Sequence, residues 1–480
     1  MTFLKKKQQS PLDRILLDLT GSGHPDDQIT VRDIHENLFV CGSTGTGKTS
    51  TIGYHLARSI LNKDGLNEAQ KFGMIVFLYK ESDARHWIDW AADAGRMDDL
   101  VIINEHTANL FNILESYADK EALSIVETLM VLNKLTSDSG GNQSSEEFWN
   151  AALKTRLHRL VTLLQLCDLP LNIVTLYQLH QSAPTSHAQM EDEAFHANSL
   201  CWQMIVQAGG KYGAEHEEFQ LVEEYFLREM PYLNDRTQSS ILAMSSALLS
   251  SFINSPMLKR LFCGTTETPL SELLCGKILL LNLPIQKHGH SGRLAQVLLK
   301  HVLQKAIEER NLTRVPNPVL MWIDEYQHFI TPHDFLYMST ARSSRGGMIL
   351  MTQNVSNIQA SIGGEAQLAR VRMNSLLALC NTKMFLAQND AMVTNPYTSN
   401  LMGKGLRKLP GSSVNIKEFG GSASISSTYE HLVLPHEFSM LKTGGVQHDG
   451  IVEAYITATG KTFSNGQNHM LVEFRQPWFA

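Results

Sequence analysis

The chain has 480 residues, of which 43% are hydrophobic and 19% are charged. This composition excludes a disordered chain and favours a globular protein with two lobes, or with one core that carries a large insertion. The formal net charge of −7 excludes a surface that is basic throughout, although a local basic groove is compatible with it.

The six cysteines are scattered and include no C-x-x-C pair. This argues against a disulfide framework or a structural zinc site and fits a reducing compartment. The N-terminal segment lacks the apolar core of a signal peptide, and nowhere do 18 apolar residues follow one another. We therefore expect a cytoplasmic protein without a membrane span.

Short apolar runs bounded by turn residues predict buried strands, and helical patterns separate them. Two of the predicted helices cover residues 49–61 and 293–310. Because strands that alternate with helices form βαβ units, the sequence predicts an α/β fold with a mostly parallel sheet. The predicted strands are residues 38–41, 73–79, 100–104, 277–284, 318–324 and 347–353.

Helical patterns dominate the middle of the chain, whereas the C-terminal part alternates β-type runs with glycine-rich turns. An all-α insertion of domain size therefore interrupts the α/β core, and the C-terminal runs are expected to add antiparallel strands to it. The predicted parts are an N-terminal segment (1–36), the two halves of the nucleotide-binding core (37–119 and 262–411), the all-α insertion (120–261) and a β-rich C-terminal extension (412–480).

The run CGSTGTGKTS, residues 41–50, fits the pattern G-x-x-x-x-G-K-[ST] between a predicted strand and a predicted helix. In such a loop several backbone N–H groups converge on phosphate oxygens, and the helix start adds its positive dipole end. Lys48 is expected to reach the β- and γ-phosphates, and the Thr49 hydroxyl to help hold Mg²⁺. The predicted nucleoside triphosphate site consists of Gly42, Ser43, Thr44, Gly45, Thr46, Gly47, Lys48, Thr49 and Ser50.

A second motif, PVLMWIDEYQHF, is an apolar strand that ends in Asp324 and Glu325. A carboxylate at the tip of a strand near the phosphate loop can hold the water shell of Mg²⁺, and this is the Walker B role predicted for Asp324. The adjacent acid can orient and deprotonate the attacking water, and this is the catalytic role predicted for Glu325.

A third motif, STARSSRGGMILMTQN, places two arginines before a strand that ends at Gln353. An amide at that strand tip can contact the γ-phosphate and distinguish a triphosphate from a diphosphate. An arginine in the preceding loop can act on the nucleotide of a neighbouring subunit. Arg342 is the first choice for that role and Arg345 the second.

Together these motifs resemble the TraG/TraD-like coupling-protein ATPases of conjugation and type IV secretion, within the FtsK/HerA group of DNA translocases. The shared features are GSTGTGKT, the helical insertion, GKILLLNLP, WIDEYQHF and an arginine eleven residues before the glutamine of TQN. NTKMFLAQNDAMVTNPYTSNLMGK and the tail with VLPHEFSMLKTGG extend the resemblance from about Val31 to the C-terminus.

The resemblance implies a RecA-like P-loop core with an inserted all-α domain, and a hexameric ring that hydrolyses ATP with Mg²⁺ at its subunit interfaces. DNA would pass through the pore, and a relaxase or another protein would bind the all-α domain. Coupling proteins of conjugation usually carry transmembrane helices at the N-terminus. Because the sequence predicts none here, we expect a cytoplasmic member or one recruited to a membrane by a partner.

The leading hypothesis is an ATP-driven DNA translocase, with strandedness left open. Adenine is preferred to guanine because the sequence has no N-K-x-D motif. A second hypothesis is an ATP-dependent switch or scaffold, in mobile-element processing or defence against foreign DNA, that assembles and recruits partners without moving DNA. A small-molecule kinase fits less well, because such chains are usually shorter and carry basic lid residues soon after the P-loop.

Overall fold

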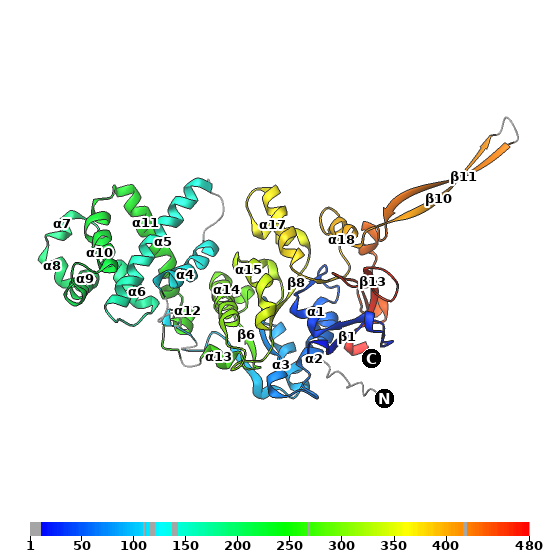
Figure 1. The fold of residues 1–480 in the computed structure, drawn as a ribbon, viewed down its shortest axis with the longest axis horizontal. Coiled ribbons are helices and arrows are strands. Elements are labelled where there is room, and N and C mark those ends of the chain that lie inside the picture. Colours follow the sequence, from blue (N-terminus) through cyan, green and yellow to red (C-terminus); the bar gives the residue numbers. More distant parts are fainter. Residues whose placement is uncertain are drawn as a thin grey trace, which may run out of the picture. The chain divides into compact units, whose positions relative to one another are not determined.

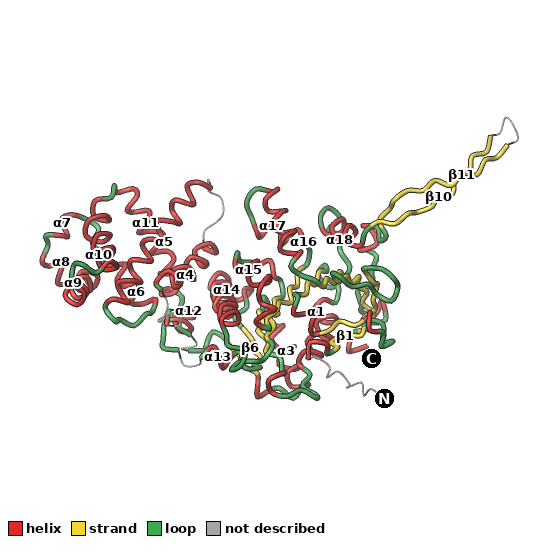
Figure 2. The backbone as a smooth tube through the Cα atoms, viewed as in Figure 1, coloured by secondary structure: helices red, strands yellow, loops and turns green. Residues whose placement is uncertain are grey.

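The computed structural model describes residues 11–108, 111–112, 114–115, 121–136, 143–266, 269–415 and 420–479. The chain divides into two compact units (Figures 1 and 2). Unit 1 contains Met1–Phe77, His86–Leu100 and Asn311–Ala480, and unit 2 contains Leu78–Arg85 and Val101–Arg310. The α/β fold class is confirmed, whereas the finer division into five parts stays a prediction.

Unit 1 is built around a sheet with the strand order β13-β12-β9-β3-β8-β7-β4. The five strands from β9 to β4 run parallel to one another, and β12 and β13 continue the sheet in antiparallel pairing. Because β3, β4, β7 and β8 are buried along their whole length, they read as apolar runs rather than alternating ones. The strands are β3 (Leu38–Cys41), β4 (Gly73–Phe77), β7 (Val319–Ile323), β8 (Gly346–Thr352), β9 (Thr382–Phe385), β12 (Ile451–Ala458) and β13 (His469–Arg475).

Helices of unit 1 accompany these strands, and one of them begins inside the phosphate-loop motif. This helix starts with a π-helical turn at Lys48–Gly53 before α2. A Cβ atom on Gly53 would lie 3.3 Å from the Trp322 ring, so the helix start packs closely over β7. The helices are α1 (Val31–His35), α2 (Tyr54–Leu61), α3 (Asp83–Asp93), α15 (His333–Thr340), α16 (Val355–Ile362), α17 (Ala366–Ala378) and α18 (Thr394–Met402).

The predicted strands of the core are confirmed to within two residues at most ends, but β9 was missed. Its sequence, Thr382-Lys383-Met384-Phe385, contains a lysine and a threonine that interrupt the apolar run. The strand nevertheless lies between β3 and β12. The Lys383 amine donates a hydrogen bond to the Cys380 carbonyl. This strand joins the parallel part of the sheet to its antiparallel part.

The C-terminal strands differ in whether they join the core sheet. β12 and β13 extend the core sheet, as predicted. In contrast, β10 (Lys404–Asn415) and β11 (Gly420–His431) pair only with each other and form a separate hairpin, seen in orange in Figure 1. The expectation that they add to the core was wrong, because their serines and glycines offer no continuous apolar face to bury. A second small sheet pairs β1 (Ile15–Asp18) with β2 (Gln28–Thr30).

Unit 2 is mainly helical and also contains the neighbouring strands β5 (Leu100–Ile103) and β6 (Ile278–Leu281). Polar residues that cap helix N-termini, such as Asn172, Ser199 and Asn234, fix where the helices begin. The helices are α4 (Ala122–Thr136), α5 (Gln143–Leu166), α6 (Ile173–Ser182), α7 (His187–Met190), α8 (Glu193–Asn198), α9 (Leu200–Tyr212), α10 (Glu217–Glu223), α11 (Asp235–Asn254), α12 (Pro256–Phe262), α13 (Leu270–Leu273) and α14 (Ile285–Glu309).

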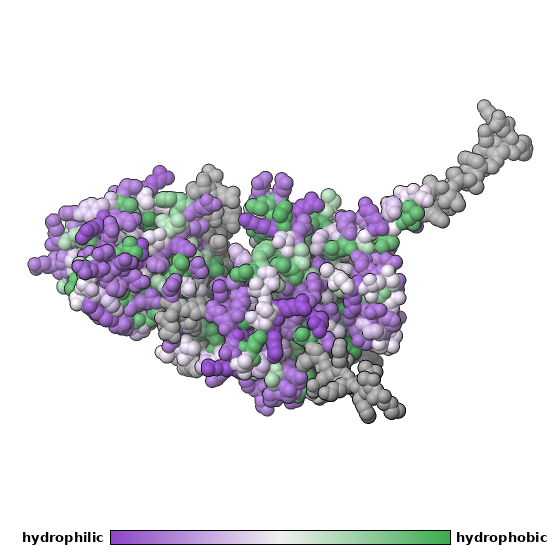
Figure 3. Space-filling model, viewed as in Figure 1, coloured by the Kyte–Doolittle hydropathy of each residue, from purple (hydrophilic) through white to green (hydrophobic). Residues whose placement is uncertain are grey.

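The helices of unit 2 bury leucine-rich faces, for example Leu157, Leu160 and Leu164 of α5. On the face shown in Figure 3, hydrophilic side chains cover much of the surface of this unit. Within the described ranges, no single helix has both the length and the apolarity of a membrane span. Helices α11 and α12 pass that test only as a pair, and they meet at an angle of 87°.

Candidate functional site

The phosphate-loop motif forms a tight loop between the end of β3 and the helix that starts at Lys48. Gly45 and Gly47 have positive φ angles of 80° and 89°, a region that residues with a Cβ atom rarely adopt. The Thr46 hydroxyl donates to the Ser43 carbonyl at 2.8 Å and closes the loop from within. The predicted loop from Gly42 to Ser50 is therefore a strand–loop–helix connection of the kind that surrounds a phosphate group.

The Lys48 side chain lies along this loop and is only 8% exposed. Its amine donates to the Gly42 carbonyl at 2.5 Å and to the Ser43 carbonyl at 3.1 Å. These carbonyls hold the cation at the centre of the loop, where an anion entering the loop would meet it. The position of Lys48 thus fits a phosphate group.

Segments from distant parts of unit 1 support the loop. The backbone N–H of Ser43 donates to the Ala387 carbonyl at 2.9 Å, just after β9. On the other side, a Cβ atom on Gly47 would lie only 2.7 Å from the Val452 side chain of β12. Packing also requires glycine at position 42, because a Cβ atom on Gly42 would lie 2.8 Å from Leu386. Gly47 is required both by packing and by its positive φ.

The Thr49 hydroxyl connects the loop to the second motif. It donates to the Asp324 carboxylate at 3.0 Å, across a separation of 275 residues. Strand β8 lies between β3 and β7. Because parallel strands present their carboxyl ends at one edge of a sheet, the residues that follow all three strands meet there. The two residues predicted to hold Mg²⁺ are thus in direct contact.

Glu325 follows Asp324 with left-handed backbone angles of φ 52° and ψ 49°. Its backbone N–H donates to the Asp324 carboxylate at 2.9 Å. Its own carboxylate accepts two side-chain amides, from Gln353 at 3.0 Å and from Gln327 at 2.7 Å. The structure thus brings Glu325 and Gln353 together, as their positions at two strand tips suggested, and it adds Gln327.

Arg342 and Arg345 lie at the opposite end of β8, because they precede this strand while the other site residues follow their strands. The strand has seven residues, so its two ends are about 20 Å apart. The Arg342 side chain is 58% exposed and pairs with Glu36 at 2.5 Å. Arg345 adopts a positive φ of 52° and donates to the Pro316 carbonyl at 2.7 Å. Arg342 is therefore not part of the phosphate site of its own chain.

Sequence reasoning missed three contributors to the site: Gln327, Val452 and the segment after β9. The amide of Gln388 in that segment contacts the Cys41 sulfur at 3.3 Å, and burial raises the pKa of the Cys41 thiol, which keeps it neutral. Gln327 had a readable signal, because it stands two residues after Glu325 in the motif. No sequence signal pointed to Val452, since only strand pairing in the sheet brings β12 next to the phosphate loop.

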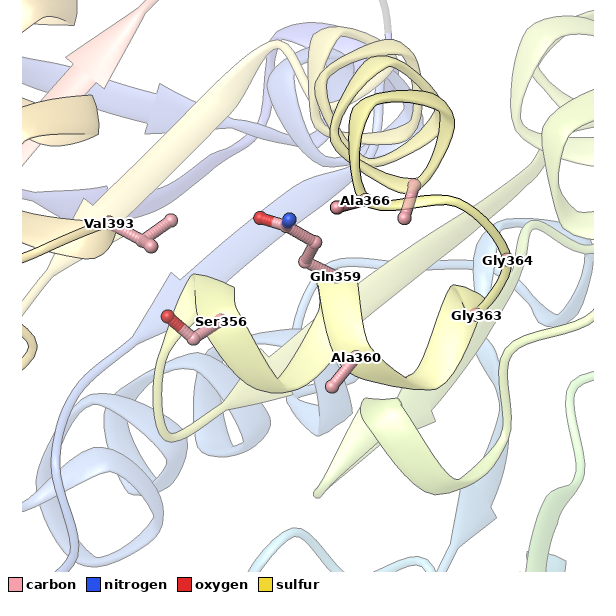
Figure 4. A pocket seen from close by; sticks show the side chains of 8 residues that line it. Ser356, Gln359, Ala360, Gly363, Gly364, Ala366 and Val393 are labelled. Carbon is pink, nitrogen blue, oxygen red and sulfur yellow. The ribbon is translucent and has the colours of Figure 1, made fainter. Parts of the chain in front are cut away.

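A separate pocket of about 320 Å³ lies between α16 and α17 (Figure 4). Small or uncharged side chains line it, among them Ser356, Gln359 and Val393. Burial raises the pKa of the neighbouring Asp390, but hydrogen bonds from Ser356 and Thr394 outweigh this effect and leave the pKa below its usual value. Because its lining includes no cation, this pocket does not fit a triphosphate.

Comparisons with known proteins place this geometry in a context. Residues 318–442 match the family model described as the TraM recognition site of TraD and TraG. This segment includes Asp324, Glu325, Arg342 and Gln353. No curated protein matches the sequence.

Among solved structures, the unbound bacterial conjugative coupling protein TrwB is similar over 94% of this chain and 88% of its own, with a TM-score of 0.61 and 15% identity. The chain has the fold of a conjugative coupling protein. TrwB with ADP and Mg²⁺ covers 95% of this chain and 88% of its own at 14% identity and a TM-score of 0.61. TrwB with an ATP analogue is similar over 98% of this chain and 90% of its own, with 14% identity and a TM-score of 0.59.

These matches confirm the resemblance to TraG/TraD-like coupling proteins that the motifs suggested. The coupling-protein fold extends over both units, since the aligned part is almost the whole chain. The family segment begins one residue before β7 and ends after the short helical turn Pro435–Ser439. The roles of the individual residues in this coupling-protein fold are proposals, developed below.

Proposed function

We propose that this chain is a Mg²⁺-dependent ATPase that drives DNA translocation in the manner of a conjugative coupling protein. The observation that carries the proposal is the meeting of Lys48, Thr49, Asp324, Glu325 and Gln353 at one edge of the unit 1 sheet. A buried amine, a hydroxyl–carboxylate pair, a second carboxylate and an amide are the groups that phosphoryl transfer to water requires.

In this site the backbone N–H groups at the helix start, from Gly47 to Thr49, bind the phosphate groups, and the Lys48 amine neutralises charge on the β- and γ-phosphates. Thr49 and Asp324 would hold Mg²⁺, and their contact at 3.0 Å places both oxygens within reach of one ion. Bound Mg²⁺ neutralises charge on the phosphate oxygens. Glu325 accepts the proton of the attacking water, and Gln353 senses the γ-phosphate.

The coupling-protein fold supports the motor part of the proposal. TrwB crystallises with ADP and Mg²⁺ and with nucleotide analogues, and the shared fold together with the phosphate loop of this chain supports ATP and Mg²⁺ as ligands here. We propose that the chain assembles into a ring, hexameric by its resemblance to the family, with nucleotide at the subunit interfaces and DNA in the pore. A relaxase or another protein is the proposed partner of the all-α part.

Steady-state ATP hydrolysis tests this function directly. The purified chain is assayed with and without single- and double-stranded DNA at low and moderate salt, with Lys48→Ala as the blank. We expect DNA to raise the wild-type rate and salt to reduce that stimulation steeply, because phosphate contacts release counterions. The strand form that stimulates more strongly identifies the preferred DNA.

Hydrolysis that DNA does not change would overturn the translocase proposal and favour an ATP-dependent switch or scaffold. The net charge of −7 is the observation in favour of that second function, because a nucleic-acid-binding surface is usually basic. Nucleotide-dependent assembly without DNA binding at low salt would support it, and a protein partner would then be sought.

Arg342 is proposed to act on the nucleotide of the neighbouring subunit, because it lies about one strand length from its own site. We expect Arg342→Ala to lower kcat by at least about 100-fold while nucleotide affinity stays within about threefold, since the phosphate loop is untouched. Turnover and equilibrium binding of a fluorescent ATP analogue measure the two effects.

Two controls separate this role from the ion pair with Glu36. Glu36→Gln removes the pairing carboxylate but keeps the guanidinium, and we expect turnover close to wild type because the Arg342 end of the pair is exposed to solvent. Mixing Arg342→Ala with Glu325→Gln subunits should restore turnover at mixed interfaces. If Arg345→Ala and not Arg342→Ala lowers turnover, the trans role belongs to Arg345.

A further inference from the structure

We propose that Gln327 is a positioning residue that holds the Glu325 carboxylate for proton transfer. This inference rests on the proposed function, because it assigns a role within the same site. Gln327 lies in the short helical turn Tyr326–His328 directly after Glu325. Its side-chain nitrogen donates to one carboxylate oxygen of Glu325 at 2.7 Å, while Gln353 donates to the other at 3.0 Å.

The orientation of the Gln327 amide is fixed from its other end. The side-chain oxygen accepts the Thr352 hydroxyl at 2.8 Å, so the nitrogen is the atom left to face Glu325. Thr352 is fully buried and Gln327 is 7% exposed. A buried amide with both ends satisfied has little freedom to rotate, and Glu325 therefore meets a fixed donor.

The strand tip of β8 thus contacts Glu325 along two routes. Gln353 reaches the carboxylate directly, and Thr352 reaches it through Gln327. Gln353 is also the residue proposed to sense the γ-phosphate. If Gln353 turns toward the phosphate, Gln327 remains as the side-chain donor that keeps the carboxylate in place. The backbone of Glu325 is itself in the left-handed region, a conformation that persists where surrounding contacts hold it.

The test compares Gln327→Met and Gln327→Ala with the wild type and with Gln359→Ala, a glutamine of α16 that lines the pocket in Figure 4. Methionine keeps a side chain of similar length but lacks the amide donor. We expect both Gln327 variants to lower kcat about tenfold with KM unchanged, as for one lost hydrogen bond to a charged group. Gln359→Ala should behave like the wild type, and thermal unfolding should show that Gln327→Met is folded.

A double-mutant cycle shows whether Gln327 acts through Glu325. In the Glu325→Gln background, single-turnover hydrolysis should be equally slow with Gln327 or methionine at position 327, because the carboxylate that the amide holds is absent. Thr352→Val should lower kcat by roughly threefold in the Glu325 background only, since it loosens the same amide.

The proposal is overturned if Gln327→Met has the kcat of the wild type or a higher one, or if its effect persists unchanged in Glu325→Gln. Either result would assign Gln327 a packing role. Failure of the proposed function gives a different result, because a wild-type rate no higher than that of Lys48→Ala leaves no activity for any Gln327 variant to reduce.

Discussion

Replacing Lys48 by alanine is expected to abolish ATP turnover, with kcat/KM lowered by at least about 1000-fold. The amine is 8% exposed and is held at the loop by the Gly42 and Ser43 carbonyls at 2.5 and 3.1 Å. Without it, phosphate oxygens lose the only cation that the motif itself supplies. Charged hydrogen bonds to phosphate contribute about 1.5–3 kcal/mol each, and their loss at the transition state lowers the rate further.

Equilibrium binding of a fluorescent ATP analogue and steady-state hydrolysis measure the effect. Lys63→Ala is the matched control, because the Lys63 amine also donates to a backbone carbonyl, that of Gly95 at 2.7 Å, but lies outside the phosphate-loop motif. The control should retain turnover and affinity. A Lys48→Ala protein that hydrolyses ATP like the wild type would rule out the phosphate loop as the site of turnover.

Replacing Glu325 by glutamine is expected to lower kcat by about 1000-fold while ATP still binds. A proton acceptor contributes about 10²–10⁴-fold to such a reaction, and an amide cannot accept the proton of the attacking water. Glutamine has the same length, so contact with one of the two neighbouring amides, at 2.7 and 3.0 Å in the native site, can persist. ATP should then hold the assembled state for longer than it does in the wild type.

Single-turnover hydrolysis measures the loss of turnover, and binding of an ATP analogue measures the retained affinity. Light scattering measures how long the assembly persists. Glu68→Gln serves as the control, because the Glu68 side chain is 90% exposed and pairs only with Lys71 among the described ion pairs. If Glu325→Gln retains wild-type turnover, the proton acceptor is a different group, and Asp324 is the next carboxylate to test.

Much of the site could be predicted because its functional residues lie in short sequence motifs. The loop of residues 42–50 needs glycines at fixed spacing, and a buried strand that ends in Asp324 and Glu325 is visible as an apolar run followed by acids. Since strand β8 also reads as an apolar run, Gln353 could be placed at its tip. Parallel pairing then required these tips to share one edge, as observed.

Other features could not be predicted because they depend on pairings between distant segments. β9 contains Lys383, whose amine is buried in the sheet and donates to the Cys380 carbonyl. The contact of Val452 with Gly47 joins residues about 400 positions apart. The β10–β11 hairpin was expected on the core, yet its polar strands pair only with each other.

The sequence by itself therefore determined the fold class, the phosphate loop and the order of the motifs, since local hydrophobic patterns and glycine spacing specify strands, helices and tight turns. The tertiary structure alone decided which side chains meet. It placed Gln353 on Glu325, Thr49 on Asp324, and Arg342 on Glu36 at the far end of β8. Side-chain contacts of this kind arise from sheet register and chain crossing, which no short stretch of sequence contains.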